Sequence, residues 1–434
     1  MDIVPDSTAR STRALLETLF RDAVAAAHPS RCLPPNLPEP PARGRLVILA
    51  AGKAAGSMTQ VAENHYADVP PTRLAGLAVT RHGYGRPTRR IPVIEAGHPV
   101  PDRIGISAAK RALKLADAVD ADDLVLVLLS GGASANWIAP APGITLEEKQ
   151  ATTRALLKSG AAIGEINTLR KHLSRIKGGR LAARAHPAKV ATLAISDVPG
   201  DDPAVIGSGP TVPDPTTLAD ARDIARRYRL DLPAAVTRAL EDPGNETPKP
   251  GDQVFAGSDY RIVARPAVAL HAAAERAKAA GYESVILSDR LQGEAREIAA
   301  EQARFALKLA AEHRRVVILS GGELTVTLRG KGRGGPNQEF ALALAIGLNG
   351  AAGVSALAAD SDGTDGGSGR PDDPAGAFID ATTLSRAGAA GLDAAAFLAD
   401  NNSTGFFNAI NDLFRPGPTF TNVTDFRAIV VDRP

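Results

Sequence analysis

The feature that most constrains the fold is a series of short apolar runs that end in glycine or a charged residue. "LVLVLLSGG" (124–132) and "VVILSGG" (316–322) begin with uninterrupted apolar residues and share the ending "LSGG". Strands that are apolar on both faces are typical of parallel sheets covered by helices on both sides. Amphipathic helices are predicted between such runs, for example over "SAAKRALKLADAV" (107–119). The pattern therefore predicts an α/β protein with a parallel sheet that helices cover on both sides.

The length of the chain predicts more than one domain. At 434 residues it exceeds what one hydrophobic core usually spans, so two domains are expected. The stretch "EDPGNETPKPGDQ" (241–253) is rich in proline, glycine and charge, which indicates an exposed linker. We therefore expect an N-terminal domain over residues 1–245, opening with an amphipathic helix in "STRALLETLFRDAVAAAH", and a C-terminal domain over residues 254–434.

Composition and charge exclude several classes of partner. The formal net charge is +2 and no long run of lysine or arginine occurs, so neither nucleic acid nor a membrane is an expected partner. No window reaches the roughly 18 apolar residues of a membrane span, and the first residues lack the apolar segment of a signal peptide. The single cysteine, Cys32, permits no intramolecular disulfide, which fits a reducing compartment. We expect a cytoplasmic protein, monomeric or homodimeric.

The residues that follow the predicted strands indicate the chemistry of the site. In an open α/β sheet, ligands bind beyond the carboxyl ends of the strands. The candidate residues at these positions are Lys53, Gly131, Gly132, Ser134, Asp197, Gly321, Gly322, Glu323, Asp360 and Asp362. Glycines let backbone amides approach phosphate oxygens, lysine adds a positive charge, and carboxylates bind magnesium. The set predicts a phosphate ester bound together with a divalent metal ion.

A glycine-rich basic loop, "LRGKGRGGPNQEFALALAIG" (328–347), is the most informative single segment. Its glycines alternate with Arg329, Lys331 and Arg333, and Pro336 suits the first position of a following helix that includes Asn337. A helix N-terminus favours anions, and the three cations add to that preference. A mobile basic surface loop is the alternative. We favour an anion site, because four glycines carry an entropic cost that requires a reason.

A second basic stretch, "INTLRKHLSRIKGGRLA" (166–182), has two interpretations. Leu169 and Leu173 lie on one helical face, while Arg170 and Lys171 lie on others. A solvated helix face explains such charge as well as a binding site does. The histidines, His98 and His172, are more typical of hydrogen-bonded structural groups than of acid–base catalysts, and no paired-histidine zinc motif occurs.

Two short motif matches fail on closer comparison. "AAGKAAGS" contains Gly52 and Lys53, but Ala54 follows where a P-loop requires serine or threonine. "DSDGT" (360–364) is similar to the first motif of haloacid-dehalogenase-type phosphatases. That motif opens its domain, however, and only about 70 residues follow it here, too few for that fold.

Taken together, several stretches resemble the type II glycerate kinases, the glycerate 2-kinase family with its C-terminal MOFRL domain. The matching stretches run in the family's order from about position 46 to 430, nearly the whole chain. They are "AAGKAA", "EAGHPVPD", "LLSGGASAN", "INTLRKHLSRIKGGRLA", "SDVPGDDPAVIGSGPTVPDPTT", "LSGGELTVTLRGKGRGGPNQEFALALA", "DSDGTDG" and "RPGPTFTNVTDF". One departure is "SGGASAN", where the family more often has a third glycine at Ala133 and a leucine at Asn136.

The resemblance implies a fold and a reaction. The fold would be an N-terminal Rossmann-like parallel sheet and a smaller C-terminal α/β domain, with the MOFRL region at about 314–430 and the active site in the cleft between the domains. The reaction would be magnesium-dependent phosphoryl transfer from ATP to the carbon-2 hydroxyl of D-glycerate, giving 2-phosphoglycerate. Members are often labelled hydroxypyruvate reductase, but no G-x-G-x-x-G nucleotide fingerprint occurs in a first βαβ unit.

The resemblance also implies roles for residues. The family's catalytic lysine and arginine correspond to Lys53 and Arg333. Asp197, Asp360 and Asp362 are candidates for metal binding or for accepting the hydroxyl proton, with Asp197 preferred as a catalytic residue and the other two as metal ligands. We expect ATP to contact Gly131, Gly132, Ser134, Gly321, Gly322, Glu323, Lys331 and Asn337. We expect glycerate to contact His98, Arg170 and Lys171. An NADH-dependent hydroxypyruvate reductase and a phosphatase using "DSDGT" are the rival functions.

Overall fold

The computed structural model describes residues 7–367 and 370–432, and the chain divides into two compact units. The first, here called the parallel-sheet unit, comprises Cys32–Val263. The second, the mixed-sheet unit, comprises Met1–Arg31 and Ala264–Pro434. Each unit contains its own six-stranded sheet and its own hydrophobic core, which agrees with the expectation of two α/β domains.

The parallel-sheet unit has the strand order β3-β2-β1-β4-β5-β6. Its strands are β1 (Leu46–Ala51), β2 (Leu74–Arg81), β3 (Val93–Ala96), β4 (Leu124–Leu129), β5 (Lys189–Ile195) and β6 (Asp259–Ala264). The pairings from β3 across to β5 are all parallel. All six residues of β1 are buried, which is the physical reason that the apolar runs predicted a covered parallel sheet.

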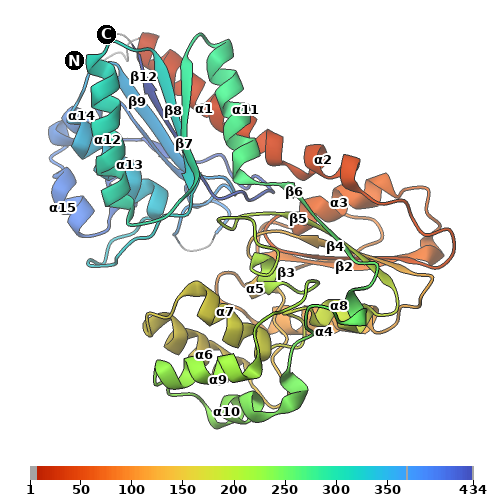
Figure 1. Cartoon of the computed structure of the whole chain (residues 1–434). Coiled ribbons are helices and arrows are strands. Elements are labelled where there is room, and N and C mark those ends of the chain that lie inside the picture. Colours follow the sequence, from red (N-terminus) through yellow and green to blue (C-terminus); the bar gives the residue numbers. More distant parts are fainter. Residues whose placement is uncertain (1–6, 368–369, 433–434) are drawn as a thin grey trace. The chain divides into compact units, whose positions relative to one another are not determined.

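Helices cover both faces of this sheet and also form a separate cluster. Figure 1 shows α3 over one face and α4 and α8 over the other. Four further helices, α6, α7, α9 and α10, pack around a small core of their own. The helices are α3 (Ala55–His65), α4 (Arg103–Ala116), α5 (Ala133–Asn136), α6 (Leu146–Lys158), α7 (Ile163–His172), α8 (Arg180–Ala185), α9 (Leu218–Arg227) and α10 (Ala234–Glu241), with α2 (Pro29–Cys32) at the junction of the two units and the short 3₁₀ helices η1 (Pro34–Asn36), η2 (Pro71–Arg73), η3 (Ile206–Ser208), η4 (Pro243–Asn245) and η5 (Gln253–Phe255).

The mixed-sheet unit has the strand order β11-β10-β9-β12-β8-β7. Its strands are β7 (Glu283–Leu291), β8 (Val316–Gly322), β9 (Val354–Asp360), β10 (Gly376–Ile379), β11 (Leu413–Phe414) and β12 (Asp425–Val431). Only β7 and β8 pair in parallel, because the fully buried β12 enters antiparallel between β8 and β9. The predicted parallel sheet is therefore that of the first unit, whereas the second sheet is mixed, a difference that apolar runs alone do not reveal.

Helices also cover both faces of the mixed sheet. Helices α1 and α11 pack on one face, and α12 and α13 pack on the other (Figure 1). The helices are α1 (Ser7–Ala27), α11 (Pro266–Ala279), α12 (Ala295–Ala311), α13 (Pro336–Leu348), α14 (Thr383–Ala389), α15 (Ala394–Ala399) and α16 (Ser403–Ala409). No helix within the described residues is long and apolar enough to span a membrane.

Helix α1 belongs to the mixed-sheet unit, although the sequence grouped it with residues 1–245. Its residue Phe20 is buried and meets Phe414 and Phe426 edge to face, with ring centroids 5.0 and 5.8 Å away. Arg13 forms an ion pair with Asp412 at 2.9 Å. The amphipathic pattern of α1 requires a partner face, but only the tertiary structure shows which sheet supplies it.

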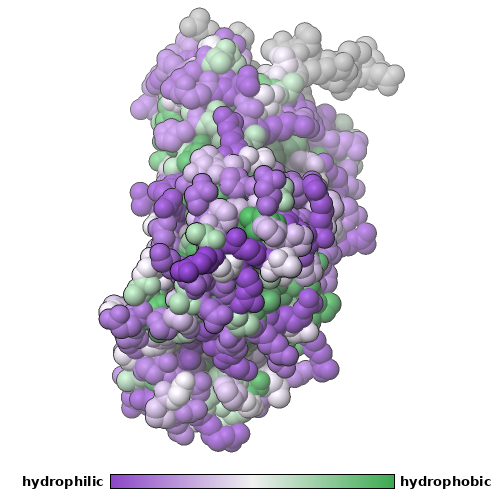
Figure 2. All heavy atoms as spheres, turned by 90° about the vertical axis from the view of Figure 1, so that its right-hand side faces the viewer, coloured by the Kyte–Doolittle hydropathy of each residue, from purple (hydrophilic) through white to green (hydrophobic). Residues whose placement is uncertain are grey.

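The second boundary also differs from the expected one. The stretch predicted as a linker is ordered, since Thr247 donates a hydrogen bond to Asp214 at 3.2 Å and Lys249 donates one to the Thr247 hydroxyl at 2.8 Å. The chain then forms β6, the edge strand of the first sheet, before the mixed-sheet unit continues at Ala264. On the face shown in Figure 2, hydrophobic residues form small patches among hydrophilic ones, as on most protein surfaces.

Candidate active site

Three adjacent strands of the parallel-sheet unit bring predicted residues to one edge. Ala51 of β1 pairs with Leu129 of β4, which in turn pairs with Ala194 of β5. Lys53 follows two residues after the first of these, and Gly132 and Asp197 follow three residues after the others. Because the strands are parallel, these residues lie at the same carboxyl edge, where ligands bind in open α/β sheets.

Hydrogen bonds join the loops after β1 and β4. The Lys53 amide donates to the Gly131 carbonyl at 2.7 Å, and the Ala54 amide donates to the Ser130 hydroxyl at 2.9 Å. Ser130 is completely buried. The position of the Lys53 backbone is therefore fixed relative to the "SGG" turn, as a charged group acting on a ligand requires.

The glycine turn after β4 presents backbone donors. Within the described part of the chain, the amides of Gly131 and Gly132 donate no hydrogen bond. Amides without an acceptor at a strand end favour an anionic ligand. The Ser134 hydroxyl, two residues further, lies 2.7 Å from the Ser208 hydroxyl. The anion-binding role of the first "LSGG" segment stays a prediction, for which these amides would be the donors.

Gly132 has no room for a side chain. Its φ is +85°, and a Cβ atom there would lie 2.9 Å from the His98 ring and 3.3 Å from Lys53 Cγ. His98 follows β3 and Lys53 follows β1, so two loops converge on this glycine. The turn thus allows a histidine and a lysine to pack directly over the backbone that carries the amide donors.

A cavity of about 430 Å³ opens beside this turn. It brings together four predicted residues, His98, Gly132, Ser134 and Arg170. The remaining lining residues are Pro99, Val100, Pro101, Ala135, Ile138, Lys149, Gln150, Thr153, Arg154, Leu157 and Lys177. We call it the cationic pocket, because its basic side chains come from α6, α7 and the segment after α7.

Two lysines of this pocket were not predicted as site residues. Lys177 is buried and donates hydrogen bonds to the carbonyls of Ser134 (2.9 Å) and Trp137 (3.3 Å). Burial, with the charge of Arg170 nearby, lowers the pKa of Lys149 to about 7. Burial and the charges of Lys149 and Arg170 also lower the pKa of Lys177. The sequence signal for Lys149 is its helical spacing from Thr152 and Leu156, with which it forms the buried face of α6.

The structure does not bring Lys171 to this pocket. Its ammonium pairs with the buried carboxylate of Asp214 at 3.4 Å. His172 is also buried, with Nδ1 2.8 Å from the Thr168 carbonyl oxygen and Nε2 3.1 Å from a Glu246 carboxylate oxygen, which agrees with the structural role expected for it. The helix α7 ends at His172.

The mixed-sheet unit also gathers predicted residues at one edge. The strands β8 and β9 run in the same direction on either side of β12. At their carboxyl ends, Asp425 of β12 lies opposite both Gly322 and Asp360. Asp425 forms an ion pair with Arg427, and both side chains are buried. Neither Asp425 nor Arg427 was singled out from the sequence, because each looks like an ordinary residue of a strand.

The second "LSGG" segment differs from the first. Gly321 and Gly322 belong to β8 itself, and the Gly322 amide donates to the Thr424 hydroxyl at 3.3 Å. A Cβ atom on Gly322 would lie 2.2 Å from the Leu291 amide nitrogen. The glycine therefore permits close approach of β7, and its amide is already bonded. Glu323, the next predicted contact, is exposed just beyond the strand.

A carboxylate of the chain occupies the amino-terminal end of α13. Asp365 accepts hydrogen bonds from the backbone amides of Asn337 (3.1 Å) and Gln338 (2.9 Å), and from both side-chain amides. Burial nevertheless raises the pKa of Asp365 to about 6, with nearby Asp425 adding to the shift. The buried Asn337 side chain also donates to Asp425 at 2.6 Å. The anion expected at this helix N-terminus is thus Asp365 itself.

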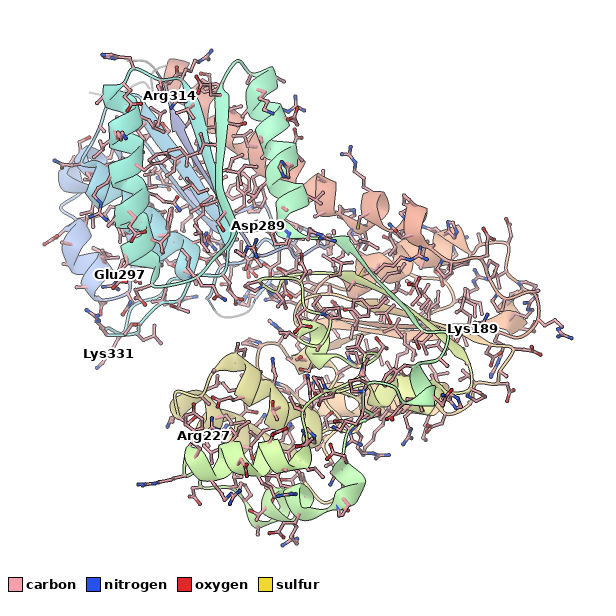
Figure 3. The ribbon with its side chains drawn as sticks, in the orientation of Figure 1. Lys189, Arg227, Asp289, Glu297, Arg314 and Lys331 are labelled. Atoms are coloured by element: carbon pink, nitrogen blue, oxygen red, sulfur yellow. The ribbon has the colours of Figure 1, made fainter. Side chains whose placement is uncertain are left out.

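The glycines of the basic loop have a packing reason. Cβ atoms on Gly330, Gly332 and Gly334 would lie within 2.3 Å of atoms in residues 400–403. Five consecutive loop amides, those of residues 329 to 333, donate hydrogen bonds to this segment. The loop backbone is therefore held by contacts within the unit. The groups of this loop that can bind a ligand are its cationic side chains. Figure 3 shows Lys331 at the end of the loop, pointing away from the unit.

Arg333 is available to a ligand. Its side chain is 67% exposed, and its ion pair with Asp373 is loose at 3.9 Å. It lines an open depression of about 820 Å³ together with Arg370, Arg415 and Asn402. An exposed arginine at a loop tip can bind phosphate oxygens without first breaking a strong internal contact.

The two predicted metal ligands have different environments. Asp360 is half-buried at the end of β9, and its Oδ1 accepts a hydrogen bond from the Asp362 amide at 2.8 Å. Asp362 is 0% exposed and accepts bonds from the amide and hydroxyl of Thr364, so it closes a turn. Over residues 7–367 and 370–432, no three His, Cys, Asp or Glu side chains are grouped to hold a metal ion.

Two family models match the chain. The model described as "Domain of unknown function (DUF4147)" matches residues 15–241, and the model of the MOFRL family matches residues 316–425. The second match falls within the region expected for MOFRL. The first covers most of the parallel-sheet unit together with part of α1.

Known relatives cover nearly the whole chain. A D-glycerate 2-kinase of Thermotoga maritima is 38% identical over 420 residues, which is 96% of this chain and 97% of the relative. A protein of Agrobacterium vitis, provisionally named a hydroxypyruvate reductase, is 48% identical over 427 residues, 97% of this chain and 95% of the relative. The crystal structure of a glycerate kinase from Thermotoga maritima has a TM-score of 0.84 at 37% identity, covering 97% of this chain and 100% of that one.

Proposed function

Because the chain belongs to the glycerate kinase family that combines DUF4147 and MOFRL domains, we propose that it transfers the γ-phosphoryl group of ATP to the carbon-2 hydroxyl of D-glycerate. The products would be 2-phosphoglycerate and ADP. The observation that carries this proposal is the joint presence of Lys53 and the open amides of Gly131 and Gly132 at one strand edge. Similarity over 96% of the chain to a D-glycerate 2-kinase supports the choice of substrate.

Phosphoryl transfer needs positive groups rather than a covalent catalyst. Negative charge spreads over the equatorial oxygens in the transition state, so positioning and electrostatic stabilisation supply most of the rate. We propose that Lys53 and Arg333 both act on the transferred phosphoryl group. The Gly131 and Gly132 amides would bind its oxygens. Asp197, beyond β5 at the edge that carries Lys53, is the proposed acceptor of the glycerate hydroxyl proton.

Magnesium fits one of the predicted carboxylates. Magnesium is usually held by one or two carboxylates together with substrate phosphates and water. Asp360 fits this chemistry because it is half-buried at a strand end, whereas Asp362 is 0% exposed. When bound, the ion would neutralise part of the phosphate charge.

The proposal is tested by a coupled assay of ADP release with D-glycerate, with and without magnesium. The position of phosphate in the product is then read by ³¹P NMR. ADP release with 2-phosphoglycerate as product supports the proposal, and 3-phosphoglycerate contradicts its regiochemistry. A double-mutant cycle of Lys53→Ala and Arg333→Ala measures whether the two act together. If they bind the same transition-state oxygens, the combined loss is smaller than the sum of the single losses.

The name of the Agrobacterium vitis relative favours a second candidate, an NADH-dependent hydroxypyruvate reductase. The turn after β1 reads "AAGKAAGS" and lacks the G-x-G-x-x-G spacing that brings backbone close to a dinucleotide pyrophosphate. Incubating the protein with NADH and hydroxypyruvate decides between the two. Steady loss of NADH absorbance, proportional to protein concentration, would support the reductase.

A further inference from the structure

The cationic pocket of the parallel-sheet unit is lined by Lys149, Arg154, Arg170 and Lys177, of which Arg154 is exposed and the other three are buried or half-buried. Among the residues described, Lys149, Arg170 and Lys177 form no ion pair with a carboxylate. Lys177 donates two hydrogen bonds to backbone carbonyls. The pocket therefore concentrates positive charge that the protein itself does not neutralise.

Lys149 is the most informative of the three. Its residue is only 7% exposed, and its ammonium makes no hydrogen bond within residues 7–367 and 370–432. A buried ammonium without a partner is costly, and such groups are usually paired or functional. Since its side chain lines the cavity, a ligand in the cavity is the natural partner. That ligand must carry negative charge.

Much of the remaining pocket wall is apolar, although Ser134, Gln150 and Thr153 also line it. The apolar side chains include Pro99, Val100, Pro101, Ile138 and Leu157. Val100 and Leu157 are 64% and 62% exposed, so they leave apolar area for a ligand to cover. A ligand that matches this wall has an apolar part as well as an anionic part. Glycerate has almost no apolar surface, whereas a nucleotide has both parts.

We propose that the cationic pocket binds the nucleotide, with Lys149, Arg170 and Lys177 holding its phosphate chain and the apolar wall covering its base. The inference rests on the proposed function for the identity of the nucleotide. It assigns Arg170 to the nucleotide rather than to glycerate, and it adds Lys149 as a binding residue. Gly132 lines the pocket and packs against Lys53, so the terminal phosphate would lie beside the group proposed to act on it.

The test compares Lys149→Met with Lys158→Met, an exposed lysine at the end of the same helix that does not line the pocket. ADP binding is measured by isothermal titration calorimetry without glycerate, so the result does not depend on turnover. Because a charge-assisted hydrogen bond is lost, Lys149→Met should bind ADP about tenfold to a hundredfold more weakly. Lys158→Met should bind ADP as the wild type does. Methionine fills a similar volume without charge, and replacement of buried charge by apolar groups often preserves or raises stability.

Other outcomes separate the pocket assignment from the proposed function. If the wild type binds no ADP or ATP, the kinase proposal fails. If the wild type binds ADP and Lys149→Met, folded by circular dichroism, binds it equally well, the pocket assignment fails alone. A variant that keeps ADP affinity but loses affinity for glycerate or 2-phosphoglycerate would overturn the assignment in favour of the acceptor. Crystals with ADP in the arginine-lined depression of the mixed-sheet unit would also overturn it.

Discussion

The ammonium of Lys171 lies 3.4 Å from a carboxylate oxygen of Asp214, and both side chains are buried. Asp214 also accepts hydrogen bonds from the hydroxyls of Thr216 (2.8 Å) and Thr247 (3.2 Å). This ion pair accounts for Lys171, while its neighbour Arg170 lines the cationic pocket. Two adjacent basic residues therefore have different roles, one structural and one proposed to bind a ligand.

Replacement of Lys171 and of Arg170 by methionine, one at a time, should affect stability in the first variant and ligand binding in the second. Lys171→Met leaves a buried, unpaired carboxylate at Asp214, so the free energy of unfolding should fall by about 3–5 kcal/mol. Arg170→Met should leave stability nearly unchanged and weaken ADP binding. Urea unfolding followed by circular dichroism and calorimetric ADP titration check the two expectations. A stable Lys171→Met protein that has lost ADP affinity would contradict this division of roles.

Gly132→Ala should impair catalysis beyond its effect on stability. Its Cβ would force back the His98 ring, and small displacements at a reacting centre can cost about 100-fold in rate. Gly143→Ala is the matched control, because Gly143 has φ +82° and open space around its Cβ position. Both variants should lose about 1–2 kcal/mol from backbone strain. Only Gly132→Ala should lower kcat/KM; equal values for the two variants would refute the packing argument.

Arg333→Ala should lower kcat without lowering stability. The side chain is 67% exposed and its ion pair is loose, so the stability change should stay within about 0.5 kcal/mol. Loss of a group that stabilises transition-state charge costs about 100- to 1,000-fold in kcat. Arg304→Ala, at an exposed position of α12 outside the loop, is the control and should retain activity. Steady-state kinetics with D-glycerate and ATP distinguish these outcomes.

Nucleotide affinity should fall as pH rises above about 7. Lys149, with its pKa lowered to about 7, is neutral at higher pH in the free protein and must take up a proton to bind phosphate. The loss should approach about tenfold per pH unit over part of the range from 7.5 to 9.5. Lys149→Met should reduce this slope. The other basic groups lining the pocket are His98, Arg154, Arg170 and Lys177, of which Lys177 adds to the slope because its pKa is also lowered. A wild-type affinity independent of pH would contradict the expectation.

Asp365 should make the mixed-sheet unit less stable as pH rises from about 4 to about 6. Its pKa is raised to about 6 in the folded protein, against about 3.9 for an ordinary aspartate, so folding favours the protonated form. The stabilisation is complete below the lower value and is lost as pH passes the higher one, on the order of 3 kcal/mol. Asp365→Asn removes this contribution. The difference in unfolding free energy between wild type and variant, followed across pH 4–7, measures it.

The sequence predicted the first strand-end site better than the second. Lys53, Gly131, Gly132 and Asp197 all follow apolar runs that form adjacent parallel strands, so their shared edge was predictable. Topology rules place ligands there. In the mixed-sheet unit, β12 enters antiparallel and Asp365 reaches the start of α13 from a distant loop. No local sequence pattern predicts either of these two contacts.

The sequence by itself determined the family, the α/β class and the strand-end positions of the glycines, Lys53 and the aspartates. These follow from local apolar patterns and short motifs, which act over a few residues. Only the tertiary structure decided that the first "LSGG" leaves its amides open while the second is bonded by Thr424 and crowded by β7. It also decided that Lys149 is buried at a cavity and that Lys171 is paired with Asp214. Burial and pairing depend on segments far apart in the chain. Residues of the same type, such as Lys149 and Lys171, can therefore have different roles.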